Sequence, residues 1–213
     1  MPQGLASYNA AHGTSYSIAE LAYPNTPYPW ANYPYDYWHL WVENGGQATA
    51  EGVPTLESLA QDREVVVFKH CFPVSSILAD TGSPSSSSST KTAENYRLQY
   101  AALKERLRQM PQKRFLVWTG AALRENASNS EQGVRARQFF TWVKDAWDEP
   151  GDNIFVWDFF ELETGGGNFL LPEYATGDSH PNTAFAQYAA PLFVNRLVDV
   201  IEGRGDSGSL TGE

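Results

Sequence analysis

The sequence predicts an α/β protein, a three-layer α/β/α sandwich with a mostly parallel sheet. Three observations carry this prediction. Apolar runs of strand length alternate with segments of helical periodicity. The runs within 64–69, 115–119 and 153–160 are almost continuously apolar, as is typical of strands buried on both faces of a parallel sheet. The connections between them are long enough for right-handed crossovers that place helices against the sheet.

Length and composition predict one domain, residues 1–203, followed by a disordered tail at 204–213. The chain has 213 residues, 42% of them hydrophobic, which is enough for one core. A net charge of −10 disfavours nucleic acid as a partner. No segment has the roughly 20 apolar residues of a membrane span. We expect a soluble protein without a membrane partner; its compartment stays open, and the mature part of an exported protein is one interpretation.

Residues 4–11 are predicted to form the first strand. A small polar turn, 12–17, follows and contains His12 and Ser15. A strand, a glycine-containing turn and a helix in this order place polar side chains at the carboxyl edge of an α/β sheet. An ordinary turn with a serine or threonine helix cap is the alternative.

The segment 23–41 combines four prolines with many aromatic residues. The prolines exclude a continuous helix and predict a stiff, extended loop that becomes helical from Asp36. Aromatic rings with polar edges suit stacking on sugars. The candidate substrate-binding residues here are Tyr28, Trp30, Tyr33 and Tyr35. A lid that packs onto the core through its rings is an equally supported interpretation.

The strand at 64–69 is the clearest in the chain and delivers Lys69 and His70 to its carboxyl end. The serine-rich segment 81–90 is predicted to be a mobile surface loop. The strand at 115–119 leads into the loop 120–126. We count Lys69 and, in this loop, Asn126 among the candidate substrate-binding residues.

Two helices are predicted between the strands, at 92–110 and 130–147. The expected inner face of the first is Tyr96, Tyr100, Leu103 and Leu107, and that of the second is Val134, Phe139, Trp142, Val143 and Trp147. A final helix from Thr183 should place Phe185, Ala189, Leu192, Leu197, Val200 and Ile201 toward the sheet. Pro191 inside it is expected to kink or restart the helix.

The stretch Gly177-Asp178-Ser179-His180-Pro181-Asn182 stands directly before this last helix. An acid, a hydroxyl and an imidazole within three residues indicate a loop that presents a catalytic base. The order of segments resembles the SGNH (GDSL-like) hydrolases, in which an acid and a histidine from such a loop serve a serine placed after the first strand. The resemblance covers most of the chain and implies a flavodoxin-like fold and ester hydrolysis.

The chain departs from the family pattern at two points. The acid usually lies three residues before the histidine, but that position is Gly177 here. The nucleophile position falls on Gly13. Ser15 can be the nucleophile only if the turn is aligned differently by two residues. The resemblance then implies Ser15 as nucleophile, His180 as base and Asp178 as the residue that orients the imidazole. The substrate class would be a small acylated molecule or an acylated carbohydrate.

Two other functions stay open. His12, His70 and His180 could form one cluster that binds a metal or serves a lyase acting on an acidic polysaccharide, although no cofactor is our main expectation. The chain could also be a carbohydrate-binding module on a degenerate hydrolase fold.

Overall fold

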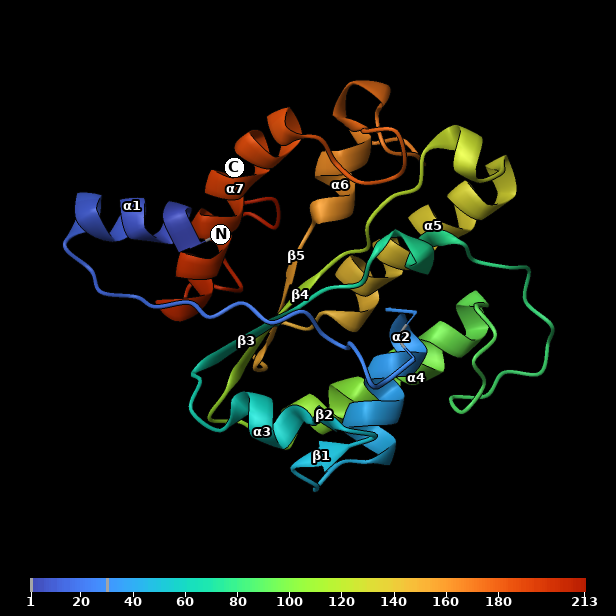
Figure 1. The fold of residues 1–213 in the computed structure, drawn as a ribbon, viewed down its shortest axis with the longest axis horizontal. Helices are drawn as coiled ribbons and strands as arrows, with labels where there is room; N and C mark the ends of the chain where they lie inside the picture. The colour runs from blue at the N-terminus through green and yellow to red at the C-terminus, as the bar shows by residue number, and fades with distance from the viewer. Residues whose placement is uncertain (1, 30) are drawn as a thin grey trace.

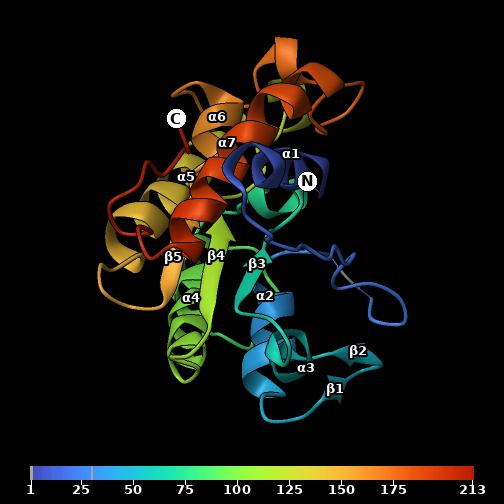
Figure 2. The same cartoon turned by 90° about the vertical axis from the view of Figure 1, so that its left-hand side faces the viewer.

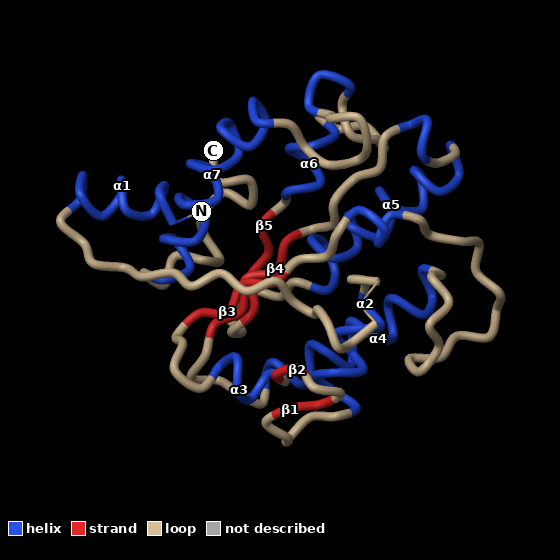
Figure 3. The backbone as a smooth tube through the Cα atoms, in the orientation of Figure 1, coloured by secondary structure: helices blue, strands red, loops and turns tan. Residues whose placement is uncertain are grey.

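The computed structural model describes residues 2–29 and 31–213 and shows a mixed α/β fold (Figure 1). Its main sheet contains three parallel strands in the order β3, β4, β5, which are Val65–Phe68, Arg114–Trp118 and Ile154–Trp157. Val66 lies opposite Phe115, and Leu116 lies opposite Phe155. A second sheet pairs the short antiparallel strands β1, Thr49–Ala50, and β2, Val53–Pro54. Figure 3 shows the main strands at the centre of the chain, surrounded by helices.

Helices pack against both faces of the main sheet (Figure 1). Successive strand residues point to opposite faces. Phe115 and Val117 therefore contact α4, Ala93–Arg108, and α5, Ser130–Trp142, on one face. Leu116 and Trp118 contact α7, Thr183–Ile201, on the other. The remaining short helices are α3 (Leu56–Ala60), η2 (Phe72–Ser75), η3 (Glu125–Ala127), η4 (Val143–Trp147), α6 (Phe159–Thr164) and η5 (Pro172–Tyr174).

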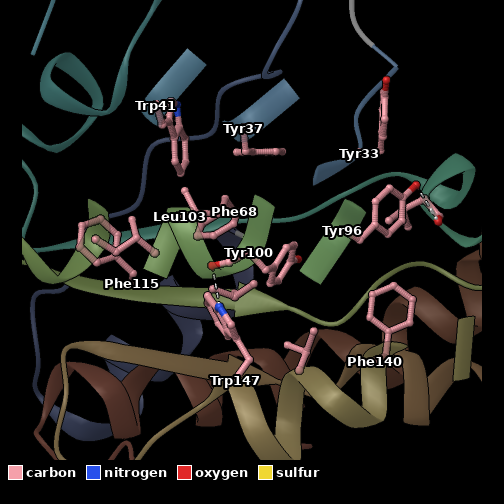
Figure 4. Packing of buried hydrophobic residues seen from close by; sticks show 14 of the residues in the cluster. Tyr33, Tyr37, Trp41, Phe68, Tyr96, Tyr100, Leu103, Phe115, Phe140 and Trp147 are labelled. Atoms are coloured by element: carbon pink, nitrogen blue, oxygen red, sulfur yellow. Dashed lines mark hydrogen bonds between the residues drawn. The ribbon is translucent and has the colours of Figure 1, made fainter. Parts of the chain in front are cut away.

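The core on the α4 side is strongly aromatic (Figure 4). Tyr37 from α2, Pro34–Tyr37, and Trp41 from η1, Trp38–Glu43, pack on Phe68 of β3. On the other side of α4, the indole Nε1 of Trp147 donates to the carbonyl of Tyr100 at 2.7 Å. The buried tyrosines and tryptophans thus join α2, η1, α4 and η4 to the sheet.

The strands and helices predicted from residue 64 onward are confirmed within a few residues. Thr92 and Asn129 begin α4 and α5 with side-chain caps that accept from backbone N–H groups three residues later. The predicted inner face of α4 is buried. On α5, however, Val134 is exposed, because the helix turns Ala136, Phe139 and Phe140 to the core instead. The aromatic segment becomes helical at Pro34, close to the predicted Asp36.

The prediction of a first strand at 4–11 is wrong. Residues Pro2–His12 form helix α1. The segment is rich in alanine and has no β-branched residue, a composition that favours helix over strand. Leu5 packs against Val194 and Val198 on the outer side of α7, so α1 adds a helix to α7 rather than a strand to the sheet (Figure 2).

The tail at 204–213 also differs from its predicted disorder. The backbone N–H of Asp158 donates to the carbonyl of Leu210, and the indole of Trp157 donates to that of Thr211. The buried guanidinium of Arg196 donates through Nη1 to the carbonyl of Gly205 at 2.6 Å. Because backbone carbonyls rather than apolar side chains make these contacts, composition alone does not reveal them.

The serine-rich loop 81–90 is exposed over most of its length but is hydrogen-bonded to α4. Gln99 donates to the carbonyls of Ser86 and Ser88, and Asn95 accepts from the N–H of Ser85. The loop is therefore anchored by two polar side chains of the helix. Among the described residues, no helix combines the length and the apolar character needed to cross a bilayer.

Candidate functional site

A cavity of about 280 Å³ lies at the carboxyl edge of the main sheet. Its walls come from the residues at or just after the ends of all three strands, together with the start of α7. Most of the lining is apolar, with Trp118, Trp157, Phe159 and Phe185 as its large side chains. The polar or ionisable residues around it are Lys69, Cys71, Glu163, Ser179 and His180. Carboxyl strand ends are where open α/β sheets bind ligands.

His180 and Asp178 form a hydrogen-bonded pair beside this cavity. Nδ1 of His180 lies 2.9 Å from Oδ2 of Asp178. The other carboxylate oxygen, Oδ1, accepts from the His180 backbone N–H and from the Thr176 hydroxyl, both at 2.9 Å. These hydrogen bonds to the charged form lower the pKa of Asp178 to about 2. The imidazole and the Phe72 ring are nearly perpendicular, with ring centroids 4.9 Å apart.

The loop that carries this pair is fixed to the loop after β4. The backbone N–H of Arg124 donates to Oγ of Ser179 at 3.1 Å, and its Nη1 donates to the carbonyl of Gly177 at 2.7 Å. Asn182 then begins α7 by accepting from the N–H of Phe185. The His180 loop is thus held on both sides, although the His180 and Asp178 side chains are more than half exposed.

The strand ends below the cavity are joined by one buried hydroxyl. Oγ1 of Thr119 donates to the Asp158 carboxylate at 2.8 Å and accepts from the N–H of Phe160. Gly120 follows with a φ of +29°, and a Cβ there would lie 2.4 Å from the Phe140 ring. Glycine is therefore required where the chain turns from β4 into the cavity wall.

Glu163 of α6 is the unexpected member of the lining. Its side chain is fully buried, and Oε2 accepts from the N–H of Ala122 at 2.7 Å. Burial raises the pKa of this carboxyl to about 8, against the lowering effects of the Ala122 hydrogen bond and the Lys69 charge. The raised pKa favours the protonated form of this carboxyl at neutral pH.

The chain matches no protein-family model, no curated protein and no solved structure. Its site is therefore interpreted from geometry and chemistry alone.

The structure does not bring Ser15 or His12 to His180. Tyr16, the neighbour of Ser15, donates its hydroxyl to Glu202 at the C-terminal end of α7. The exposed His12 ring stacks on Tyr8 of α1, with centroids 4.1 Å apart. His180 precedes the other end of α7, and a 19-residue helix is about 28 Å long. The expected Ser15–His180 pair is wrong because 4–11 is not a strand and its turn does not reach the sheet edge.

His70 is also separate from His180. It is fully buried on the α4 side of the sheet, where Nε2 lies 2.8 Å from the Tyr100 hydroxyl. Burial, with a smaller effect of Lys69, lowers its pKa to about 3. The predicted cluster of three histidines does not form, since His70 is buried against Tyr100 of α4 whereas His180 lines the cavity at the sheet edge. Within residues 2–29 and 31–213, no group of three or more His, Cys, Asp or Glu is arranged to hold a metal ion.

The aromatic segment packs onto the core rather than around the cavity. Tyr28 is buried and donates to Asp36, and Tyr33 is buried and donates to the carbonyl of Ser89. Tyr35 stacks on His39 of η1, with centroids 5.7 Å apart. None of these three tyrosines lines the cavity. Trp30 lies outside the described residues.

Asn126 and Lys69 do lie near the His180 loop. Asn126 lines a second hollow of about 450 Å³, whose lining is mostly apolar and also includes the side chains of Arg124, Asp178 and Ser179. The two hollows share Phe72 and Ser179. Lys69 lines the first cavity. Glu163, Trp118 and Arg124 are not among the predicted residues. For Glu163 the reason is that a buried glutamate in a short helix has no distinctive sequence pattern.

Proposed function

We propose that the protein is a hydrolase of carboxylic esters, with His180 as the general base and Asp178 as its orienting partner. The observation that carries the proposal is the 2.9 Å contact between Nδ1 of His180 and Oδ2 of Asp178 beside an apolar cavity at the sheet edge. A carboxylate on one ring nitrogen fixes the tautomer and stabilises the imidazolium, so that the other nitrogen can accept a proton. This is the acid–base chemistry that ester hydrolysis needs.

The nucleophile in this proposal is water. Nε2 of His180 removes a proton as the water oxygen attacks the acyl carbon, and the imidazolium then returns the proton to the departing alkoxide. The products are a carboxylic acid and an alcohol. Ser15 lies too far away, and Oγ of Ser179 already accepts from the N–H of Arg124. Lys69 lines the cavity and supplies positive charge for the oxyanion.

The two hollows, which share Phe72 and Ser179 in their linings, support an ester with unlike halves. The apolar cavity suits the acyl group, since its volume is near the lower end of the roughly 300–1,000 Å³ of small-molecule sites. In the second hollow, the side chains of Arg124 and Asn126 offer hydrogen bonds to a hydroxylated alcohol such as a sugar. An acylated carbohydrate is thus the proposed substrate class. The tyrosines at 28, 33 and 35 do not contribute to it.

The finer architecture is part of the same proposal. We infer a reduced three-layer sandwich of the SGNH type, and its support is the parallel strand order, the helices on both faces and the Asp178–His180 loop before the last helix. The helix at Pro2–His12 is the main departure from that arrangement. The lyase interpretation is not favoured, because it needs His12, His70 and His180 in one place.

A panel of acetyl and butyryl esters, including acetylated sugars, tests the proposal. We expect turnover that His180→Ala lowers by about 10²-fold or more. His12→Ala is the matched control, because it removes an exposed histidine at the far end of α7. Absence of turnover on the whole panel, combined with binding of the sugars, would favour a carbohydrate-binding module instead.

A further inference from the structure

The side chain of His39 has a carboxylate at each of its two ring nitrogens. Nδ1 lies 2.5 Å from Oε2 of Glu43, four residues later in η1, and Nε2 lies 2.6 Å from Oε1 of Glu51. A neutral imidazole has one N–H donor and one acceptor nitrogen, whereas an imidazolium has two donors. Since an ionised carboxylate can only accept, both contacts are hydrogen bonds only when both ring nitrogens are protonated. This arrangement therefore favours a positively charged His39.

Glu51 reaches His39 from the tip of the β1–β2 hairpin. The register of the two strands leaves Glu51 and Gly52 as a two-residue turn, and both have a positive φ, +48° and +81°. This is the type I′ geometry that hairpins favour. A Cβ on Gly52 would lie 2.5 Å from Cγ of Pro27, so the turn packs closely on the loop before α2. The contact between Glu51 and His39 thus joins the hairpin turn to η1 beside this loop.

Two tyrosines also contact the His39 ring. Tyr35 of α2 and Tyr28 of the loop before it stack on the imidazole, with ring centroids 5.7 and 6.1 Å away. Burial raises the pKa of both tyrosines above the usual 10, so they stay neutral while His39 titrates. In the part of the chain that the structure describes, neither Glu43 nor Glu51 forms an ion pair with a lysine or arginine. The charge that balances these two carboxylates is therefore the proton on His39.

We propose that His39 is a pH-dependent switch that holds the hairpin turn against η1. With both nitrogens protonated, the ring binds Glu43 and Glu51 at once. When one proton leaves, one carboxylate faces an unprotonated nitrogen, and the two acceptors repel each other. Glu43 stays close because it lies in the same helical segment, so the hairpin turn with Glu51 is the part that is released. The hairpin lies at the opposite end of the molecule from α6 (Figure 1 and Figure 2), away from the cavity at the sheet edge.

The hairpin turn is held at low pH and released as the pH rises. Burial lowers the pKa of His39, but the hydrogen bonds to Glu51 and Glu43 outweigh it and raise the pKa above the usual 6.5. A group whose pKa is higher in the folded state stabilises that state fully below its unfolded value. The contribution of His39 is therefore complete below about 6.5 and is lost as the pH rises through its raised pKa.

Nuclear magnetic resonance of the full chain tests the switch between about pH 5 and 9. The ring signals of His39 give the midpoint of its titration, which we expect above 6.5, the usual value for histidine. The amide of Val53, which pairs with Ala50 across the turn, reports on the hairpin. Its protection against hydrogen exchange, corrected for intrinsic exchange, should fall about tenfold or more through the same midpoint.

Glu51→Gln removes the charge at the hairpin turn and keeps the length of the side chain. The midpoint of His39 should be lower in this variant, because one carboxylate is lost. The fall in Val53 protection should disappear, because a glutamine amide can accept from a ring N–H or donate to an unprotonated nitrogen. Glu51 is 49% exposed, so the substitution leaves the fold intact. The matched control is Glu131→Gln, which removes an exposed charge on α5 and should leave both measurements unchanged.

A His39 midpoint at or below 6.5 would overturn the proposal. An equal fall in Val53 protection in Glu51→Gln and the original chain would do the same. A raised midpoint combined with Val53 protection that does not depend on pH would also contradict it, because the turn would then stay in place without the imidazolium.

Discussion

The imidazole Nδ1 of His180 lies 2.9 Å from the carboxylate of Asp178, and the same carboxylate accepts the backbone N–H of His180. Two residues of one loop thus fix both the ring and the backbone of the proposed base. A spacing of two residues permits both contacts, because Oδ1 of Asp178 accepts from the backbone N–H of His180 while Oδ2 contacts Nδ1 of its ring. The shorter spacing between acid and histidine therefore still allows the two side chains to form a hydrogen bond.

Asp178→Asn should lower the kcat of ester hydrolysis about 10- to 100-fold. The amide cannot stabilise an imidazolium as the carboxylate does, although the ring stays near its position. Steady-state kinetics on a butyryl ester measures the effect. Asp80→Asn, an exposed acid on the distant serine-rich side, is the control. Equal kcat in Asp178→Asn and the original chain would remove Asp178 from the mechanism.

Ser15→Ala should leave kcat/KM for ester hydrolysis unchanged. The serine follows α1 at the far end of α7 from His180, and its neighbour Tyr16 contacts Glu202 there. The family resemblance gives the opposite expectation, a loss of several powers of ten. Loss of activity in a folded Ser15→Ala chain would show that the N-terminal turn reaches the site.

Glu163 should make the protein less stable as the pH rises toward 8. The folded chain holds a proton on this carboxyl up to about pH 8, whereas an unperturbed glutamate releases it near 4.5. The folded state then binds more protons than the unfolded state, and the free energy of unfolding falls by about 1.4 kcal/mol per pH unit in that range.

Urea unfolding between pH 6.5 and 8 measures this slope. His70 does not interfere there, since its lowered pKa of about 3 changes stability only below about 6.5. Glu163→Gln should reduce the slope, most clearly between pH 7 and 8, above the pKa of about 7 to which burial raises Asp148, and Glu161→Gln should retain it. An unchanged slope in Glu163→Gln would contradict a protonated Glu163 in the folded chain.

Deleting residues 210–213 should destabilise the protein by about 1.5–4.5 kcal/mol. Three carbonyls are lost, those of Leu210, Thr211 and Gly212, which accept from Asp158, Trp157 and Asn195. Each such bond contributes about 0.5–1.5 kcal/mol. Chemical unfolding of the shortened chain measures the loss, and Ser209→Ala is the mild control. A disordered tail would give no change.

From about residue 64 onward the fold follows from local sequence patterns, and before that it does not. Val65–Phe68 and the face of α4 with Tyr96 and Tyr100 are predicted correctly because apolar periodicity and burial agree there. Residues 4–11 are too poor in β-branched side chains to form the expected strand. The aromatic segment was ambiguous because tyrosine suits both a sugar platform and a core.

The candidate site is likewise predicted only in part from the sequence. The loop with Asp178 and His180 is recognisable because its acid and imidazole are adjacent in sequence. Glu163 becomes notable only through full burial and a free Oε1, which depend on the packing of α6 under the loop after β4. The family resemblance points to Ser15, and the position after a strand points to His70, but neither signal indicates which face of the sheet the side chain occupies.

The most direct test of the hydrolase is the rate of butyryl ester hydrolysis by His180→Ala, with and without imidazole in solution. If His180 is the base, the variant loses about 10²-fold or more of kcat/KM, and added imidazole restores part of it. Hydrolysis by His180→Ala at the rate of the original chain, without imidazole, would contradict the account.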